Sequence, residues 1–446
     1  MLNVRIYLQD RLTSFRMILL SFILFIFTGA LLLSLPCASV GSGGVSFLDA
    51  LFTSTSAACV TGLVVFDTAT KWTLFGRIVI MILIQIGGLG VVTAAVAVVS
   101  LTGVQIGIMP RIAIQDAVSA PQIGGVLHFM KFLIAGTFCI EAIGAFCLYP
   151  FFSSQFGPVK GVGYAVFHSV SAFCNAGFDL MGVREQFSSL TSCSANILVN
   201  MTIMLLIIIG GIGFLTWEDL LHCRFHFKRL RLQTKMILTT TALLILLPFL
   251  YFFLVEFRGS TGTERVLLSL FQSVTPRTAG FNTFDYSQMS ESGWFITILL
   301  MMVGGAPGST AGGMKITTLG ILILSANAYL RRKEYVNCYG RRIEQDVIHN
   351  AMALLTLYIT LLFTGTMIVS NIEGLPILPS MFECASALGT VGLTTGITTS
   401  LSTVSRLILI SFMFFGRIGG ITLGYALAST VRLNTGRFPV ENVSVG

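Results

Sequence analysis

The feature that most constrains this chain is a series of long apolar stretches with short polar connections between them. A helix that spans a bilayer needs about 20 apolar residues. Charged residues make up only 10% of the sequence, against about 25% in an ordinary soluble domain, so a polar surface could not cover these stretches. We therefore expect an all-α membrane protein with eight transmembrane helices, rather than a soluble enzyme or a secreted disulfide scaffold. The expected spans are 17–36, 76–101, 132–152, 197–217, 236–255, 292–330 (interrupted), 351–370 and 406–431.

The lysines and arginines are distributed unevenly along the chain. They concentrate in the N-terminal segment, in the connections 102–131, 222–235 and 331–349, and in the C-terminal tail. Because positively charged connections stay on the cytoplasmic side, we expect a multi-pass protein of the cell membrane with both termini in the cytoplasm. Every basic run abuts an apolar stretch, which favours contact with anionic lipid or an acidic partner surface over a nucleic acid.

The remaining connections repeat one pattern four times. A Phe begins a short helix-compatible stretch that ends in a Gly followed by Leu or Phe. The Phe-to-Gly pairs, spaced by 10, 10, 9 and 10 residues, are Phe52 and Gly62, Phe167 and Gly177, Phe271 and Gly280, and Phe382 and Gly392. A second Gly-rich landmark follows each pair, at Gly87, Gly210, Gly304 and Gly416. One such loop would be an ordinary turn, but four in register indicate four copies of a helix, a re-entrant loop and a second helix.

These repeats divide the chain into parts with defined boundaries. The predicted repeats are 14–101, 128–221, 234–330 and 349–431, and residues 432–446 form a cytoplasmic tail.

Four glycine-containing loops around one axis suit the transport of a cation. An ion that enters a low-dielectric medium loses hydration at an idealised cost of order 20 kcal/mol. Rings of backbone carbonyls can replace that hydration, and glycine tolerates the backbone angles that turn such carbonyls toward an axis. The three-residue filter stretches that end in the four glycines contain no acidic side chain, which favours carbonyl coordination over a ring of carboxylates.

These segments resemble the Trk/Ktr/HKT superfamily of potassium transporters, and the whole chain is most similar to its Ktr-type membrane subunits. The resemblance implies four M1-P-M2 repeats around one pore with pseudo-fourfold symmetry, and potassium as the only metal, held at the selectivity filter. Some plant relatives that favour sodium have Ser at the first filter glycine, so Gly62 favours potassium. The residues that match the family's filter segments are Val60, Thr61 and Gly62; Asn175, Ala176 and Gly177; Thr278, Ala279 and Gly280; and Thr390, Val391 and Gly392.

The sixth span is interrupted by a segment that cannot form a regular helix. Five glycines and Pro307 lie within ten residues, where proline removes a backbone donor and glycine weakens the helix. A kinked, tightly packed helix is the alternative, but discontinuous helices often mark transport sites. The resemblance implies an intramembrane gate loop that obstructs the pore below the filter. Its residues are Gly304, Gly305, Ala306, Pro307, Gly308, Ser309, Thr310, Ala311, Gly312 and Gly313, followed by Lys315.

Arg417 lies inside the last apolar stretch, at the position where two other repeats have Gly88 and Gly211. A charge within the membrane is costly, so a functional role is the first hypothesis, and a buried Arg that satisfies carbonyls is the alternative. The resemblance implies a pore charge under the filter that repels cations and contacts the gate loop. Glu141 has no evident partner and is interpreted as structural, while Arg277 suits packing and ion repulsion equally.

The function that these features favour is potassium uptake, either passive or coupled to sodium. A sodium-permeable HKT-like transporter is the alternative within transport. A polytopic membrane enzyme is disfavoured because no His, Asp or Glu cluster is evident, and we expect no enzyme activity and no covalently bound cofactor. The resemblance implies a homodimer with a cytosolic ring of RCK domains as regulatory partner, and any nucleotide would bind to that partner.

Overall fold

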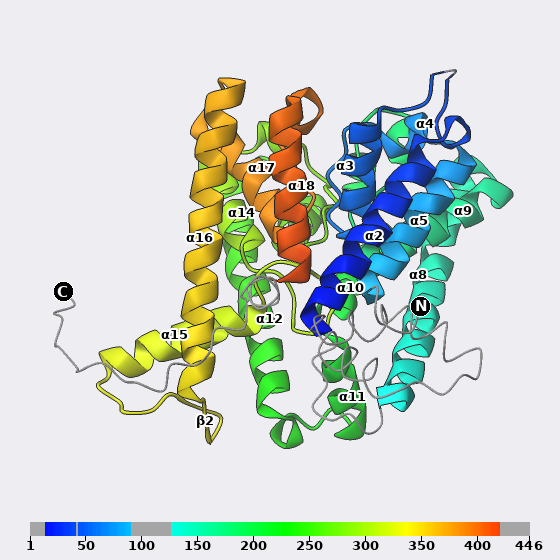
Figure 1. Ribbon diagram of the computed structural model, residues 1–446. Coiled ribbons are helices and arrows are strands. Elements are labelled where there is room, and N and C mark those ends of the chain that lie inside the picture. Colours follow the sequence, from blue (N-terminus) through cyan, green and yellow to red (C-terminus); the bar gives the residue numbers. More distant parts are fainter. Residues whose placement is uncertain (1–13, 42, 91–125, 420–446) are drawn as a thin grey trace, which may run out of the picture.

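The computed structural model describes residues 14–41, 43–90 and 126–419, and this part of the chain is mostly helical (Figure 1). Four outer helices each precede one of the Phe-to-Gly stretches: α2 (Ser14–Ser34), α8 (Val126–Phe156), α12 (Leu232–Tyr251) and α16 (Gln345–Glu373). Four short helices carry those stretches: α3 (Phe47–Ala58), α9 (Pro158–Phe173), α13 (Gly262–Val274) and α17 (Ile377–Gly389).

A third set of helices follows the four glycines and leads back across the molecule: α5 (Leu74–Leu89), α10 (Ile197–Gly211), α14 (Glu291–Met301) and α18 (Thr403–Ile418). Further elements are α4 (Thr68–Lys71), α11 (Phe214–His222), α15 (Ile316–Leu330) and a hairpin of β1 (Asn337–Cys338) with β2 (Arg341–Arg342). Three helical stretches in the described residues are long and apolar enough to cross a membrane alone: Phe129–Phe156, Leu232–Glu256 and Gln345–Glu373.

In three of the predicted spans, a helix of the described residues ends at the Gly-rich landmark or within two residues of it. The span expected over 197–217 is not one straight helix, since α10 and α11 meet at an angle of 91°. Gly213 between them has φ 90°, which the right-handed helix does not allow. The helices α5 and α18 likewise end before Gly90 (φ 88°) and Gly419 (φ 89°).

Other predictions fall outside the described residues. These are the N-terminal arginines Arg5 and Arg11, the span portions 91–101 and 420–431, most of the basic connection 102–131, and the tail 432–446.

The third set of helices contacts the short helices in a closed cycle. The helix α5 packs on α9, α10 on α13, α14 on α17, and α18 returns to α3. Each short helix is thus held by the helix that precedes it in the cycle, as well as by its own outer helix. This arrangement gathers the four glycine-containing loops at the centre of the molecule.

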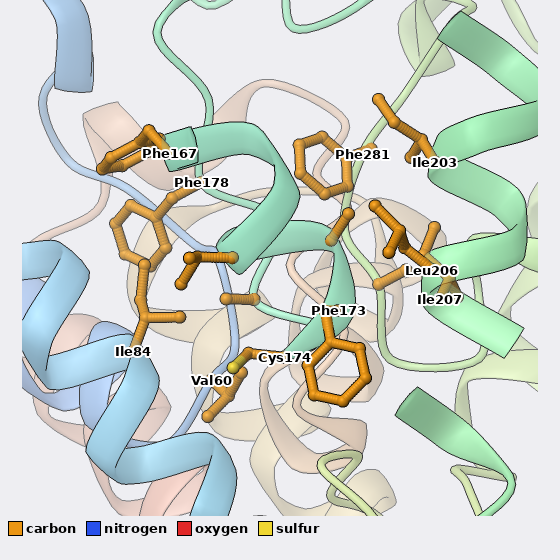
Figure 2. Packing of buried hydrophobic residues seen from close by; sticks show 14 of the residues in the cluster. Val60, Ile84, Phe167, Phe173, Cys174, Phe178, Ile203, Leu206, Ile207 and Phe281 are labelled. Atoms are coloured by element: carbon orange, nitrogen blue, oxygen red, sulfur yellow. The ribbon is translucent and has the colours of Figure 1, made fainter. Parts of the chain in front are cut away.

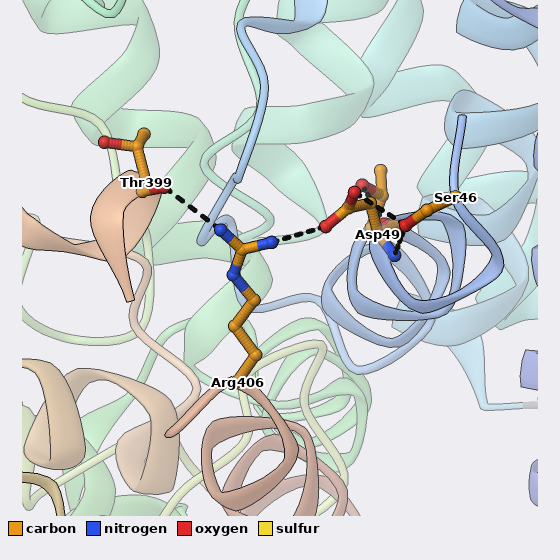
Figure 3. A network of polar contacts seen from close by, with 5 residues as sticks. Ser46, Asp49, Thr399 and Arg406 are labelled. Atoms are coloured by element: carbon orange, nitrogen blue, oxygen red, sulfur yellow. Dashed lines mark hydrogen bonds and ion pairs between the residues drawn. The ribbon is translucent and has the colours of Figure 1, made fainter. Parts of the chain in front are cut away.

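One ion pair closes the cycle between the first and last parts of the chain (Figure 3). The Arg406 guanidinium on α18 lies 2.6 Å from a carboxylate oxygen of Asp49 on α3 and donates a second hydrogen bond to the Thr399 carbonyl. Ser46 caps the same helix and donates to the other Asp49 oxygen. Both charged side chains are largely shielded, so the pair is less screened than an exposed one.

Apolar side chains fill the space around the short helix α9 (Figure 2). Phe173 and Phe178, on either side of the second loop, are buried together with Ile84 of α5 and Ile207 of α10. Dense packing of this kind leaves little room for backbone movement. It therefore gives the loop between the two phenylalanines a rigid support.

Candidate functional site

The four predicted filter segments (60–62, 175–177, 278–280 and 390–392) adopt one shared backbone conformation. Each begins within four residues of the end of a short helix, with its first and third residues at positive φ. The first residues are Val60 (57°), Asn175 (59°), Thr278 (66°) and Thr390 (52°), and the third are Gly62 (94°), Gly177 (67°), Gly280 (78°) and Gly392 (93°). Positive φ is unusual for residues with a Cβ, and for branched Val and Thr it indicates strain that the surroundings maintain. The third segment shares this pattern although its Phe-to-Gly spacing is one residue shorter.

The filter segments also touch one another in a closed ring. A Cβ placed on each glycine would lie 2.8 Å or less from the carbonyl oxygen of the middle residue of the next segment. The pairs are Gly62 with Ala176, Gly177 with Ala279, Gly280 with Val391, and Gly392 with Thr61. The four glycines therefore allow the four backbones to approach one axis, with carbonyl groups between them.

A hydroxyl four residues after each repeated Phe holds the filter backbone, and the sequence interpretation missed it. Ser56 and Ser386 accept hydrogen bonds from the N–H of Gly62 and Gly392, at 3.1 and 3.0 Å. In the other two segments the hydroxyl donates to the carbonyl after the glycine, Ser171 to Phe178 at 2.7 Å and Thr275 to Phe281. All four hydroxyl-bearing side chains are buried. Aligning the repeats beyond Phe and Gly would have revealed this position.

One face of the ring opens into a small hollow. All four filter glycines line it, together with the carboxylates Asp67 and Asp179. Both carboxylates lie in the connections that follow the filter segments, outside the membrane-spanning helices. The hollow thus presents negative charge where a cation would approach the glycines.

The charge of this hollow should vary near neutral pH. Burial, together with the nearby Asp67 carboxylate, raises the pKa of the Asp179 carboxyl to about 7. Hydrogen bonds from Met181 and Ser189 lower this pKa and so offset part of the increase. Asp179 is then negative above that pH and neutral below it. A unit charge a few ångströms away in water contributes on the order of 1 kcal/mol, so we expect cation uptake at low cation concentration to fall about two- to fivefold between external pH 8 and 6.

The measurement is tracer uptake as a function of external pH in the parent and in Asp179→Asn. The substitution should flatten the pH profile, whereas Glu185→Gln, an exposed position in the same connection that does not line the hollow, should leave it unchanged. An unaltered profile in Asp179→Asn would exclude this carboxyl as the titrating group.

The predicted gate loop (304–313) lies directly against the filter segments. A Cβ on Gly312 would collide with the Thr390 side chain, and one on Gly313 would lie 2.9 Å from the Gly389 carbonyl. The loop is non-helical, because α14 ends at Met301 and α15 begins at Ile316. Most of it is buried.

The gate loop is held by backbone hydrogen bonds with three neighbouring helices, α10, α11 and α18. The N–H of Ala306 donates to Gly211 at 2.9 Å, and the N–H of Phe214 donates to Gly308 at 2.8 Å. The N–H of Gly313 donates to Gly416 of α18 at 3.0 Å. Several of the backbone groups that lack helical partners are thus satisfied by protein, which suits a segment at membrane depth.

Arg417 joins the gate loop to α5. Its guanidinium donates to the carbonyl of Thr310 in the loop and to the carbonyls of Gly87 and Gly88 at the end of α5. Lys315 donates to the Ala311 carbonyl at 2.8 Å within the loop's own end. Both basic side chains therefore lie beside the gate loop.

The structure also places the two charged residues whose roles were left open. Glu141 is buried on α8 and accepts a hydrogen bond from Gln85 Nε2 at 3.2 Å, close to Cys174. Arg277, beside the third filter segment, is buried and donates to the Thr241 hydroxyl at 3.4 Å. In the part of the chain that the structure describes, no three His, Cys, Asp or Glu side chains form a group suited to a metal ion.

Comparison with known proteins agrees with this geometry. The family model of the TrkH cation transport proteins matches residues 11–437. The chain belongs to this Trk/Ktr family. It is 40% identical to the Ktr system potassium uptake protein B of Bacillus subtilis and 38% identical to the potassium/sodium uptake protein NtpJ of Enterococcus hirae. Each alignment covers 98% of this chain, with 97% and 98% of the relative.

The fold of this Trk/Ktr family member is also similar to a solved structure. The potassium transporter TrkH from Vibrio parahaemolyticus superposes with a TM-score of 0.74 at 20% identity, over 94% of this chain and 86% of that one. The resemblance expected from the filter segments is thereby confirmed. Because the family consists of cation transport proteins, the membrane-enzyme alternative is excluded.

Proposed function

We propose that this protein takes up potassium through a pore lined by the carbonyls of the four filter segments. The observation that carries the proposal is the closed ring in which each filter glycine meets the middle carbonyl of the next segment. Such a ring can replace the hydration shell of a cation. The names of the relatives, which specify potassium or potassium and sodium, support the choice of ion.

The proposed architecture is four M1-P-M2 repeats, 14–101, 128–221, 234–330 and 349–431, with eight spans and pseudo-fourfold symmetry. The cyclic packing of α5, α10, α14 and α18 on the short helices supports this arrangement. The positive-inside rule supports a cell-membrane location with both termini and the tail 432–446 in the cytoplasm.

In this proposal the gate loop closes the conduction path on the inner side of the filter. Its contacts with Thr390 and Gly389 support that position. Arg417 acts there in two ways, because it fastens the loop through the Thr310 carbonyl and adds a positive charge to the path of a cation. Lys315 fastens the loop's far end.

Substituting Arg417 should raise potassium uptake by about three- to tenfold, since hydrogen bonds to a charged group contribute roughly 1.5–3 kcal/mol and the loop keeps its backbone contacts. We expect this for Arg417→Ala in tracer uptake by reconstituted protein. Arg417→Lys separates the two roles: if it behaves as the parent, charge dominates, and if it behaves as Arg417→Ala, the clamp on Thr310 dominates. Parent-like uptake in both variants would contradict a role in gating.

The membrane subunit would function as a homodimer with a cytosolic RCK-domain ring, and any nucleotide would bind that ring. The relatives' designation as parts of a Ktr system supports a partner subunit. Exposed basic side chains near β1 and β2, and at Lys228 and Arg229, offer an acidic partner a docking surface on the cytoplasmic side.

The decisive experiment is tracer flux with the purified chain in liposomes. Potassium and rubidium uptake is measured with and without sodium, and sodium uptake is measured separately. We expect rubidium entry that potassium inhibits and that exceeds sodium entry. Equal entry of sodium would support the HKT-like alternative, stimulation by sodium would support coupling, and uptake no faster than in empty liposomes would overturn the proposal.

A further inference from the structure

The residue after each repeated Phe is polar and buried, although it lies in a short helix packed on all sides. These residues are Thr53, His168, Gln272 and Glu383, each no more than 2% exposed. A buried polar side chain is costly unless it is hydrogen-bonded. Their partners therefore indicate why such groups are kept at this position.

Three of the four side chains bind the equivalent residue just after their own filter segment. His168 Nε2 accepts from the N–H of Leu180 at 3.2 Å, Gln272 Nε2 donates to the Thr283 hydroxyl at 3.3 Å, and Glu383 Oε1 accepts from the N–H of Thr395 at 3.1 Å. Leu180, Thr283 and Thr395 each lie three residues after the filter glycine of their own segment. Each bond thus connects the short helix before a filter segment to the irregular backbone just after that segment.

Each of these side chains is anchored further. His168 Nδ1 lies 2.8 Å from the Tyr164 carbonyl, so Nδ1 carries the proton and Nε2 is free to accept. Gln272 Oε1 accepts from the Tyr286 hydroxyl. Glu383 also accepts from the hydroxyls of Thr394 and, at 2.8 Å, Thr398.

The first repeat differs from the others. Thr53 donates to the Asp49 carbonyl at 2.9 Å within its own helix, and the residue three positions after Gly62 is the apolar Val65. Among the hydrogen bonds of the described residues, none links Thr53 to the backbone just after the first filter segment. The first segment therefore lacks the cross-link that the other three have.

We propose that His168, Gln272 and Glu383 are positioning residues that brace the irregular backbone just after the second, third and fourth filter segments and thereby maintain ion selectivity. The proposal rests on the proposed function of these segments as the filter. A site that discriminates between ions needs its ligands held within about 0.5 Å, and the brace fixes both ends of each carbonyl-bearing segment. The unbraced first segment depends on its neighbours in the ring.

The test compares potassium and sodium tracer uptake by the reconstituted full-length protein, expressed as the ratio of the two. Glu383→Ala should lower the ratio about five- to tenfold, because the carbonyls lose their fixed geometry while the helix remains. Glu383→Gln and His168→Gln each introduce the residue that the third repeat has at this position. Both variants should keep most of the parent's ratio of potassium to sodium uptake. Thr53→Ala is the matched control at the same register and burial, and should leave the ratio unchanged.

The outcomes separate the brace from the filter. Gly392→Ser is measured in parallel, because it alters the same segment directly. If Gly392→Ser lowers the ratio and Glu383→Ala does not, the brace is refuted and the filter stands; if neither lowers it, the filter assignment fails as well. If Thr53→Ala lowers the uptake ratio as much as Glu383→Ala does, the loss reflects packing of the short helices, and the brace is refuted. Should Glu383→Ala not fold, Thr398→Val removes one donor from the same carboxylate, and an unchanged ratio in that folded variant refutes the brace.

Discussion

Deleting residues 305–312 is expected to raise potassium uptake at least about tenfold, which corresponds to about 1.4 kcal/mol. The loop is closed by several backbone hydrogen bonds to α10, α11 and α18, each contributing roughly 0.5–1.5 kcal/mol, so opening the native loop should cost more than that amount. The deletion removes the loop and this cost together.

The geometry at the ends of the loop favours a folded deletion variant. The N–H of Gly304 donates to the Met314 carbonyl at 2.8 Å, and a Cβ on Gly313 would lie 3.5 Å from the Gly304 Cα. Gly304 and Gly313 can therefore be joined with little displacement of α14 or α15.

The measurement is initial tracer uptake in liposomes, with elution volume and thermal unfolding as controls of folding. The ratio of potassium to sodium uptake should stay close to that of the parent, because the filter segments are intact. A folded deletion variant with uptake equal to or below the parent would assign residues 304–313 to packing instead.

Substituting Gly62→Ser should lower the ratio of potassium to sodium uptake at least about tenfold while the protein still inserts. The added Cβ would lie 2.5 Å from the Ala176 carbonyl oxygen, and Gly62 has φ 94°, which a residue with a side chain rarely adopts. Either the first filter segment moves away from the axis or the Ala176 carbonyl turns, and both change the ring that coordinates the ion.

Gly163→Ser is the matched control for this substitution. Gly163 lies in the short helix α9, its φ is not positive, and a Cβ there meets nothing within 4 Å. It should retain the selectivity of the parent. Equal selectivity in the parent and in Gly62→Ser would remove the first segment from the filter.

The sequence predicted the backbone of the site better than its side chains. Gly62 and Gly392 were identified because only glycine suits the conformation that they adopt, and the glycines themselves are visible in the sequence. Val60 and Thr390 adopt positive φ against their own preference, because tertiary contacts impose it, and their residue type carries no sign of this.

The sequence also did not predict hydrogen-bond partners that lie far apart along the chain. Arg417 was identified as a charge that is costly within the membrane. Its partners are the carbonyls of Thr310, Gly87 and Gly88, and because every residue has a carbonyl, the residue types did not identify them. Glu141 likewise meets Gln85 only through the packing of α8 against its neighbours. The break after α10 was missed because the glycines at 210–213 were used to align repeats rather than to end a helix.

The ion pair between Arg406 and Asp49 has a consequence for how the protein is made. The two residues are 357 positions apart, and they join α18, the last helix of the described residues, to the short helix α3. At a synthesis rate of about 5–20 residues per second, α3 waits roughly 20–70 s before α18 has been made. During that interval the first filter segment has no neighbour on one side. The ring can therefore close only after α18 has been made, and a nascent chain that stops short of α18 leaves Asp49 without its Arg406 partner.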